Sequence, residues 1–250
     1  MKKLFTVLVL TGLFAVVGAQ VKSTELWTGP VIKYNISKKL RFDFEQQFRF
    51  NENISRYNYT LSEFSLRYKV FKYLNVKAIY RYYLIPSDAE TIPYVTKYNK
   101  SRFSFDAATG TNIFNKDIKI SYRIRYQDTW KSTSEVSKHF ISTTNSSDHY
   151  IRNAFGLSYN LSKLVDPYLG WDNFFRLDGM NEIRQNRYTI GFEWKLTNDL
   201  DIDSYFHYEK EMNVTAPQSS YIIGLAAVYT FNYSKRNQSM DMLSPSSPQN

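Results

Sequence analysis

The segment Leu40–Phe50, with the sequence LRFDFEQQFRF, alternates apolar and polar side chains. One face carries Leu40, Phe42, Phe44, Gln46, Phe48 and Phe50, and the other carries Arg41, Asp43, Glu45, Gln47 and Arg49. Because the side chains of a strand point alternately to its two faces, this segment predicts a strand between an apolar medium and a wet one. About ten residues is also the length at which a tilted strand crosses a bilayer. The segment therefore predicts one strand of a transmembrane β-barrel.

The same alternation recurs along most of the chain. It predicts strands over Val31–Ile36, Leu40–Phe50, Leu61–Val70, Leu74–Leu84, Arg102–Ile113, Ile118–Tyr126, Tyr150–Leu161, Val165–Leu177, Arg187–Leu196, Leu200–Tyr208 and Tyr221–Phe231. Long connections are predicted over roughly 51–58, 85–101, 129–149, 178–186 and 209–220, with short turns between them. Short periplasmic turns and longer extracellular loops are typical of outer-membrane barrels. We therefore predict an all-β fold, an antiparallel transmembrane β-barrel over residues 20–231.

The number of strands depends on the residues before Leu40. Bacterial single-chain barrels have an even number, and Val31–Ile36 adds one strand to ten that follow. Either Val21–Trp27 forms a further strand, which gives twelve, or the N-terminal stretch lies inside a ten-stranded barrel. Proline is tolerated at the start or edge of a strand. We therefore favour a break at Gly29-Pro30 and twelve strands.

The two ends of the chain differ from this barrel pattern. Met1-Lys2-Lys3 precedes an apolar run over Leu4–Val17 and small residues up to Ala19. This is the pattern of a secretory signal peptide over residues 1–19, cleaved near Ala19. Residues 232–250 lose the alternation and gain Ser, Pro and Asn, which predicts a flexible periplasmic tail. The expected location is the bacterial outer membrane.

Composition narrows the classes of function. The chain has no cysteine, which excludes disulfides and thiolate metal sites. Its 17% aromatic content suits aromatic girdles at the membrane interfaces, and we expect outer-membrane lipid and lipopolysaccharide as its surroundings. Tyr221–Phe231 has one apolar face that ends in an aromatic residue, as in strands read by the barrel-assembly machinery. The formal net charge of +9 is spread along strands, so no nucleic-acid partner is predicted. No motif indicates a cofactor.

Several short motifs add a family resemblance. A Trp lies near the start of the mature chain, an acidic strand ends in arginine, and a Tyr-Arg-Tyr strand follows. The residues are Trp27, Glu45 with Arg49 and Asn51, Tyr80-Arg81-Tyr82, Arg123-Ile124-Arg125-Tyr126 and Pro167-Tyr168. In these the chain resembles the domain-of-unknown-function 2490 family of uncharacterised outer-membrane β-barrel proteins. Trp171-Asp172 stands where a Glu would be expected after the aromatic residue. The resemblance implies an outer-membrane barrel with no assigned activity.

Strand periodicity assigns the candidate lumen lining. Its residues are Arg41, Asp43, Glu45, Arg49, Arg67, Lys69, Lys77, Arg81, Arg102, Asp106, Lys119, Arg123, Arg125, Glu193, Asp201, Asp203, His207 and Glu209. Bases dominate the strands between residues 61 and 126, whereas acids gather on 187–208 and 40–50. An open lumen with this excess of bases would favour anions. Burying an unpaired charge costs several kcal/mol, so a salt-bridged, closed interior is the alternative.

Three functions follow. The first is a narrow passive channel for small polar or anionic solutes, or else a structural outer-membrane protein. The second is a secreted soluble β-protein that binds a small apolar ligand, which would turn Ile120 inward and Arg123 outward. The third is a lipid-modifying enzyme built on His149, Asp148 and the hydroxyl-rich stretch Ser142–Ser147. Because neighbours in sequence do not make a catalytic triad, we predict no enzymatic activity. The oligomeric state is left open.

Overall fold

The computed structural model describes residues 21–86, 95–114, 117–136, 141–179 and 181–232. The predicted signal peptide and the predicted tail lie outside these ranges. Within them, no helix has the length and apolar character needed to cross a membrane. The described residues form strands joined by turns.

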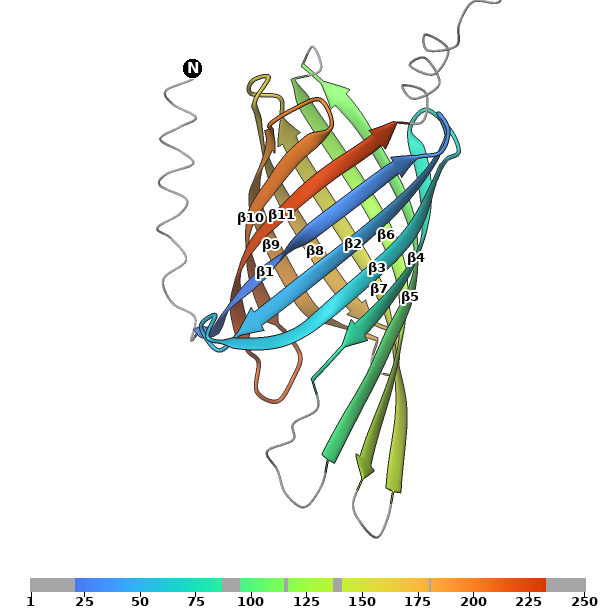
Figure 1. The fold of residues 1–250 in the computed structure, drawn as a ribbon, viewed down its shortest axis with the longest axis vertical. Coiled ribbons are helices and arrows are strands. Elements are labelled where there is room, and N and C mark those ends of the chain that lie inside the picture. The colour runs from blue at the N-terminus through green and yellow to red at the C-terminus, as the bar shows by residue number, and fades with distance from the viewer. Residues whose placement is uncertain (1–20, 87–94, 115–116, 137–140, 180, 233–250) are drawn as a thin grey trace, which may run out of the picture.

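Eleven strands close into one barrel, shown in Figure 1. They are β1 (Val21–Asn35), β2 (Leu40–Asn51), β3 (Arg56–Lys69), β4 (Leu74–Leu84), β5 (Val95–Ile113), β6 (Ile118–Val136), β7 (Ile141–Tyr159), β8 (Val165–Arg176), β9 (Glu182–Lys195), β10 (Leu200–Glu211) and β11 (Ser219–Asn232). Sequential neighbours pair antiparallel, whereas β1 and β11 pair parallel and complete the ring. An odd number of alternating strands requires such a parallel pair.

The strand count falls between ten and twelve, but the twelve that we favoured is wrong. Gly29-Pro30 does not divide the N-terminal segment, because β1 runs through it and pairs with β11 along its length. The ladder to β2 omits only the Gly29 and Pro30 pairs and keeps its register on both sides. Pro30 has no amide hydrogen to give to that ladder. A Cβ atom at Gly29 would overlap the carbonyl oxygen of Gln46, so glycine permits the close approach of β2.

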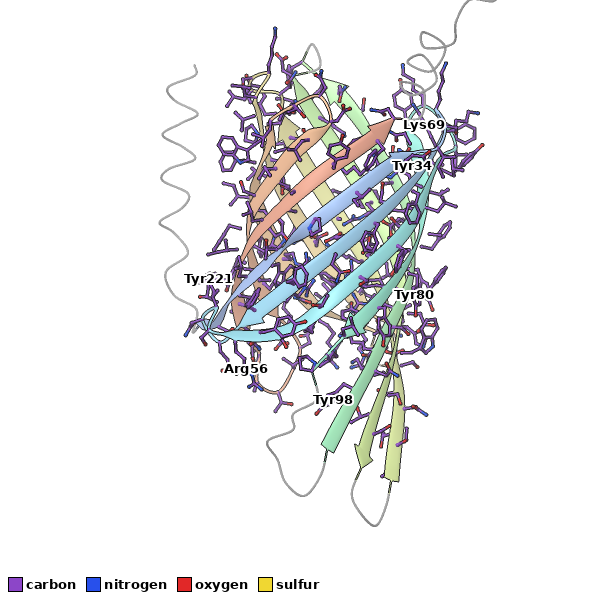
Figure 2. The ribbon with its side chains drawn as sticks, in the orientation of Figure 1. Tyr34, Arg56, Lys69, Tyr80, Tyr98 and Tyr221 are labelled. Carbon is purple, nitrogen blue, oxygen red and sulfur yellow. The ribbon has the colours of Figure 1, made fainter. Side chains whose placement is uncertain are left out.

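The two faces of the wall have the polarity of a membrane barrel. Phe48, Phe64 and Ile120 point outward and are 40–43% exposed. Figure 2 shows Tyr80 projecting away from the barrel in the same way. Asp106, by contrast, points inward and is 2% exposed. The predicted alternation is confirmed, and a soluble protein that binds an apolar ligand inside does not fit this polar interior.

The two ends of the barrel are unequal, because β5, β6 and β7 have 19 residues each and the other strands have 11–15. These three strands project beyond the rim in Figure 1. The predicted long loop over 129–149 is therefore wrong, since β6 continues to Val136 and β7 begins at Ile141. The β2–β3 connection is also short, with Glu52, Asn53 and Ile54 at positive φ. We call this rim the long-strand end and the other rim the short-turn end.

The middle of the parallel pair has an apolar inner surface, between the inward charges of Glu25 and Lys33. Trp27 of β1 lies beside Gly224 of β11 in the ladder, and Ile222 and Val228 are buried on the same side. The ring of Tyr205 covers Gly224 from the neighbouring strand, so closely that a Cβ atom there would overlap it. Such cross-strand packing of an aromatic ring over glycine gives the β10–β11 pair an interlocking contact.

Candidate functional site: a charged lumen

A cavity of about 1430 Å³ occupies the inside of the barrel. Its lining reaches from Lys72 and Tyr73, in a turn at the short-turn end, to Glu211 and Val214 beside the β10–β11 connection at the other end. Lysine and arginine outnumber aspartate and glutamate in this lining by about two to one. Barrels larger than eight strands have room for such a space, which side chains alone do not fill. The cavity is therefore polar, positively charged and lined from rim to rim.

One part of the lumen is covered by ion pairs, which we call the paired wall: Asp106–Arg125, Glu63–Arg81 and Asp172–Arg152. Arg125 binds Asp106 through two parallel contacts of 2.5 and 2.7 Å, Nε to Oδ1 and Nη2 to Oδ2. Arg81 Nε lies 3.0 Å from Glu63 Oε2, and Arg152 Nη2 lies 2.9 Å from Asp172 Oδ2. Paired donors facing two carboxylate oxygens make the strongest kind of charged hydrogen bond. Charge on this wall is neutralised by the protein itself.

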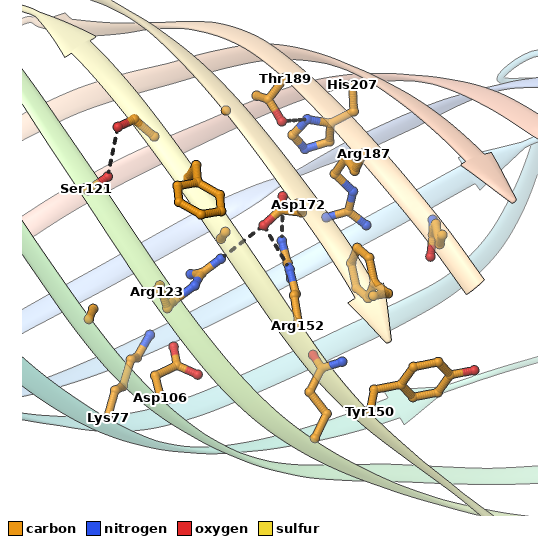
Figure 3. A pocket seen from close by; sticks show the side chains of 18 of the residues that line it. Lys77, Asp106, Ser121, Arg123, Tyr150, Arg152, Asp172, Arg187, Thr189 and His207 are labelled. Carbon is orange, nitrogen blue, oxygen red and sulfur yellow. Dashed lines mark hydrogen bonds and ion pairs between the residues drawn. The ribbon is translucent and has the colours of Figure 1, made fainter. Parts of the chain in front are cut away.

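Further cations join the same carboxylates. Lys77 Nζ is 3.5 Å from Glu63 Oε1 and 3.6 Å from Asp43 Oδ2. Arg123 Nη2 approaches Asp172 Oδ1 to 3.6 Å, and Figure 3 shows Arg123 and Arg152 meeting Asp172 from two strands. The carboxylates of the wall thus each hold one or two cations, which fixes the side chains against the barrel interior.

Nearer the long-strand end, three cations have no such partner. We call Arg49, Lys100 and Arg102 the basic cluster. Arg49 Nη1 donates to the Tyr59 hydroxyl at 2.7 Å, and Arg102 Nε donates to Thr129 Oγ1 at 2.8 Å. Lys100 Nζ lies 4.5 Å from the centre of the Tyr83 ring. All three cations line the main cavity.

Trp27 connects the basic cluster to the parallel pair. The Arg49 guanidinium carbon lies 3.5 Å from the centre of the Trp27 ring, and that of Arg187 lies at 5.3 Å. His207 meets the same indole edge-on at 5.9 Å and accepts or donates a hydrogen bond with Thr189 Oγ1 at 2.8 Å, visible in Figure 3. A cation over an indole face is attracted to the ring, so Trp27 orients Arg49 toward the lumen.

Most of the predicted lumen residues line the main cavity: Glu45, Arg49, Arg67, Lys69, Lys77, Arg81, Arg102, Asp106, Lys119, Arg123, Asp203, His207 and Glu209. Arg41 and Asp43 line a smaller pocket of about 290 Å³ on the same inner face. Arg125 is buried against Asp106, and Glu193 stands opposite Asp203 in the β9–β10 ladder. Asp201 instead lines a separate pocket at the β9–β10 turn, away from the main cavity.

The acids do not form a wall of their own. Glu63 and Asp106 belong to the strands predicted to be basic, and each is held by arginine. On the side predicted to be acidic, Glu209 is bound by Arg187, and Asp203 accepts a hydrogen bond from Tyr168 at 2.8 Å. Among the described residues, the cations without an ion pair lie at both ends of the lumen, in the basic cluster near the long-strand end and at Arg67, Lys69 and Lys119 nearer the short-turn end. Charge therefore does not divide the lumen into two opposite halves.

Sequence reasoning missed part of the basic cluster. The predicted strand began at Arg102, so Lys100 fell in a predicted loop although it lies two residues earlier on the same face. Tyr83 likewise shares the inward face of Arg81, and the period of two would have found it. Trp27 entered as the end of a possible strand and through the family resemblance, and not as a lumen residue. No pattern in the sequence distinguishes an inward indole from one at the membrane interface.

His149 is not part of a serine-type triad in this geometry. Its Nδ1 lies 3.2 Å from Asp128 Oδ1 and 3.2 Å from the Tyr126 hydroxyl. Asp148 points to the opposite face of β7, where it binds Lys131 and Arg176. The catalytic set considered from the sequence is therefore divided between the two sides of the wall. Within the described ranges, no group of three His, Cys, Asp or Glu side chains is placed to hold a metal ion.

Over residues 24–219 the chain matches the model of a family described as a protein of unknown function (DUF2490). The match covers nearly the whole barrel. The chain belongs to the DUF2490 family. This confirms the family resemblance, and the DUF2490 model ends at the first residue of β11. No curated protein matches the sequence.

Proposed function

We propose that this DUF2490 protein is an integral outer-membrane β-barrel that passes small polar solutes, preferentially anions, through its lumen. The observation that carries the proposal is the polar, positively charged cavity whose lining reaches both rims. A closed barrel satisfies every wall hydrogen bond without a sheet edge, which a spanning structure in lipid needs. The outward apolar side chains supply the surface that lipid would cover.

In this proposal the short turns face the periplasm and the long-strand end faces outward. Lipid and lipopolysaccharide surround the outward face, and the aromatic face of β11 serves as the signal for the barrel-assembly machinery. Phe71 and Phe114, both in or beside short turns, are the most exposed aromatic side chains at 68% and 73%. Aromatic rings at this level suit the interfacial girdle of a barrel.

Labels on β6 test the membrane part of the proposal. Ile120 points outward and Arg123 points into the cavity. A spin label at Ile120 should contact a lipid-phase relaxation agent, whereas a label at Arg123 should respond to an aqueous one. Lipid contact at position 123 alone would overturn the barrel orientation, and fractionation away from the outer membrane would overturn the location.

Conductance tests the channel part. The purified protein, in a planar bilayer under a potassium chloride gradient, should give discrete openings with a reversal potential on the chloride side. A structural outer-membrane protein is the second candidate, because the paired wall holds many charges in fixed contacts. A folded barrel, verified by its heat-sensitive mobility in a gel, that gives no conductance would favour that candidate.

A further inference from the structure

The basic cluster differs from its neighbours Arg81 and Lys131, which line the same part of the cavity and are bound by acids. No carboxylate of the described part of the chain lies within 4.0 Å of Arg49, Lys100 or Arg102. The nearby acids make their contacts elsewhere. Glu63 binds Arg81, Asp148 binds Lys131, and Glu45 accepts a hydrogen bond from Gln47. Three positive charges on the inner wall therefore have no carboxylate of the described residues within ion-pair distance.

Several hydrogen-bond donors of this region are also free. Arg102 uses only Nε, toward Thr129, which leaves its two terminal nitrogens without a protein partner in the described residues. The same holds for Lys100 Nζ and for the Tyr83 hydroxyl. All of these residues line the cavity, so a solute in the lumen can reach them. Free donors and unpaired charge coincide at one place.

Aromatic rings hold these donors in position. Lys100 Nζ and the Arg102 guanidinium carbon lie 4.5 and 5.8 Å from the centre of the same Tyr83 ring. Tyr59 packs against Tyr83 at 5.7 Å between ring centres and binds Arg49 through its hydroxyl. The register supports this grouping, because Tyr83 pairs with Lys100 and Arg102 pairs with Thr129. The three cations are thus preorganised around two tyrosines.

From this arrangement we infer that the basic cluster is a binding site for a multiply charged oxyanion of the phosphate class. A guanidinium fork matches the oxygens of phosphate in two parallel hydrogen bonds, and an ammonium adds a point charge. Holding three cations together without a counter-charge is costly, and an anion of charge two or more offsets that cost better than chloride does. The inference rests on the proposed function, whose solute class it names.

Calorimetric titration of inorganic phosphate into the detergent-solubilised full-length protein, at pH 8 and fixed ionic strength, tests the site. One saturable site for each chain is expected, with chloride at the same ionic strength giving none. Arg102→Gln and Lys100→Gln should each weaken binding at least tenfold. Lys119→Gln is the matched control, since Lys119 also lines the cavity but lies at the start of β6, near the short-turn end. It should leave the affinity unchanged.

Trp27 provides a local reporter of the same event. Its ring stacks on Arg49 and is 5% exposed, whereas Trp130, Trp171 and Trp194 point outward. A variant with these three tryptophans replaced by phenylalanine keeps a single indole beside the cluster. Phosphate should shift its fluorescence with the affinity found by calorimetry. This measurement also shows whether the weakened variants are still folded, because an unfolded chain would expose Trp27 before phosphate is added.

Glycerol 3-phosphate distinguishes two sources of the same chemistry. Tighter binding of this monoester indicates a phosphorylated organic solute or a lipid headgroup, and tighter binding of inorganic phosphate indicates the free ion. Either result supports the site. Absence of binding, equal binding of chloride, or equal weakening by Lys119→Gln and Arg102→Gln would overturn it. Phosphate binding without conductance would refute the channel alone, and conductance without binding would refute the site alone.

Discussion

The paired wall and the basic cluster share the lumen and strand β5, but they differ in how their charge is balanced. In the paired wall, Arg125 and Asp106 are nearly inaccessible and satisfy each other. In the basic cluster, Arg102 faces the cavity with one hydroxyl partner and no acid. A buried ion pair contributes to holding the side chains of the interior in one arrangement. Cations without a carboxylate partner contribute little to this fixed arrangement of side chains, and they remain available to bind a solute.

The largest expected effect comes from breaking the paired wall. Asp106→Ala leaves the Arg125 guanidinium buried without a counter-charge, so the free energy of unfolding should fall by roughly 3–5 kcal/mol. Urea unfolding of the lipid-embedded protein measures this loss. The double variant Asp106→Ala with Arg125→Ala should lose less than the single variant, because no uncompensated charge remains. A loss below about 1 kcal/mol in the single variant would mean that water reaches the pair.

The next largest effect is expected when a cation of the basic cluster is given a carboxylate partner, as in the paired wall. Thr129 is 1% exposed and already accepts a hydrogen bond from Arg102. Thr129→Asp would give that guanidinium a carboxylate, and phosphate binding should be lost while the folded state is retained. Calorimetry measures the loss of phosphate binding, and the heat-sensitive mobility of the barrel in a gel measures whether the fold is retained. Thr129→Asn adds similar bulk without charge and should leave phosphate binding within a few-fold of the original, which separates charge from shape.

Removing one cation should affect selectivity and leave stability almost unchanged. Arg102→Gln breaks no ion pair, so the free energy of unfolding should change by no more than about 1 kcal/mol. The chloride preference in a bilayer should decrease, because a lumen charge is lost. The test compares the free energies of unfolding of Arg102→Gln and Asp106→Ala. If Arg102→Gln destabilised the barrel as much as that variant, the basic cluster would have a structural role after all.

The smallest expected effect on stability comes from a carboxylate that is not part of the paired wall, Asp178 at the long-strand rim. Although desolvation opposes ionisation, hydrogen bonds from the His149 backbone amide and the Arg176 guanidinium hold the pKa of the Asp178 carboxyl below its ordinary value. Because this pKa is lower in the folded state than in the unfolded one, the contribution to stability is complete above about pH 4 and is lost as the pH falls further.

Asp178→Asn should remove that acid-dependent part. Asp178 is close to the surface, so the change in the free energy of unfolding at neutral pH should stay below about 1 kcal/mol. Unfolding curves at pH 7 and pH 3 would show the variant and the original protein approaching each other at the lower pH. A constant difference between them at both pH values would assign the effect to packing.

How far the sequence predicts the fold depends on contrast between the two faces of a strand. Leu40–Phe50 has such contrast, and its inward and outward residues lie where they were expected. Ser142 to Ser147 has none, because this part of β7 projects beyond the rim of the barrel and is polar on both sides. A pattern based on alternating hydrophobicity cannot find strands there, so 129–149 was interpreted as a loop.

The N-terminal strand was missed for a different reason. Gly29-Pro30 usually indicates a break, and only the close approach of the Gln46 carbonyl shows why both residues fit within β1. The candidate site was predicted in part: periodicity placed Arg49 and Arg102 in the lumen. It did not show which cations have acids beside them, because that depends on the register between strands, as in the pairing of Asp106 with Arg125.

The parallel pairing of β1 with β11 also fixes the rim of the barrel at which the first strand begins and the rim at which the last strand ends. Both strands run in the same direction, so Val21 starts at the long-strand rim and Asn232 finishes at the short-turn rim (Figure 1). In the proposed orientation the assembling chain must deliver its first strand residue to the cell exterior and keep its last one in the periplasm. Antibodies would then bind an epitope placed before Val21 and an epitope placed after Asn232 from opposite sides of the membrane.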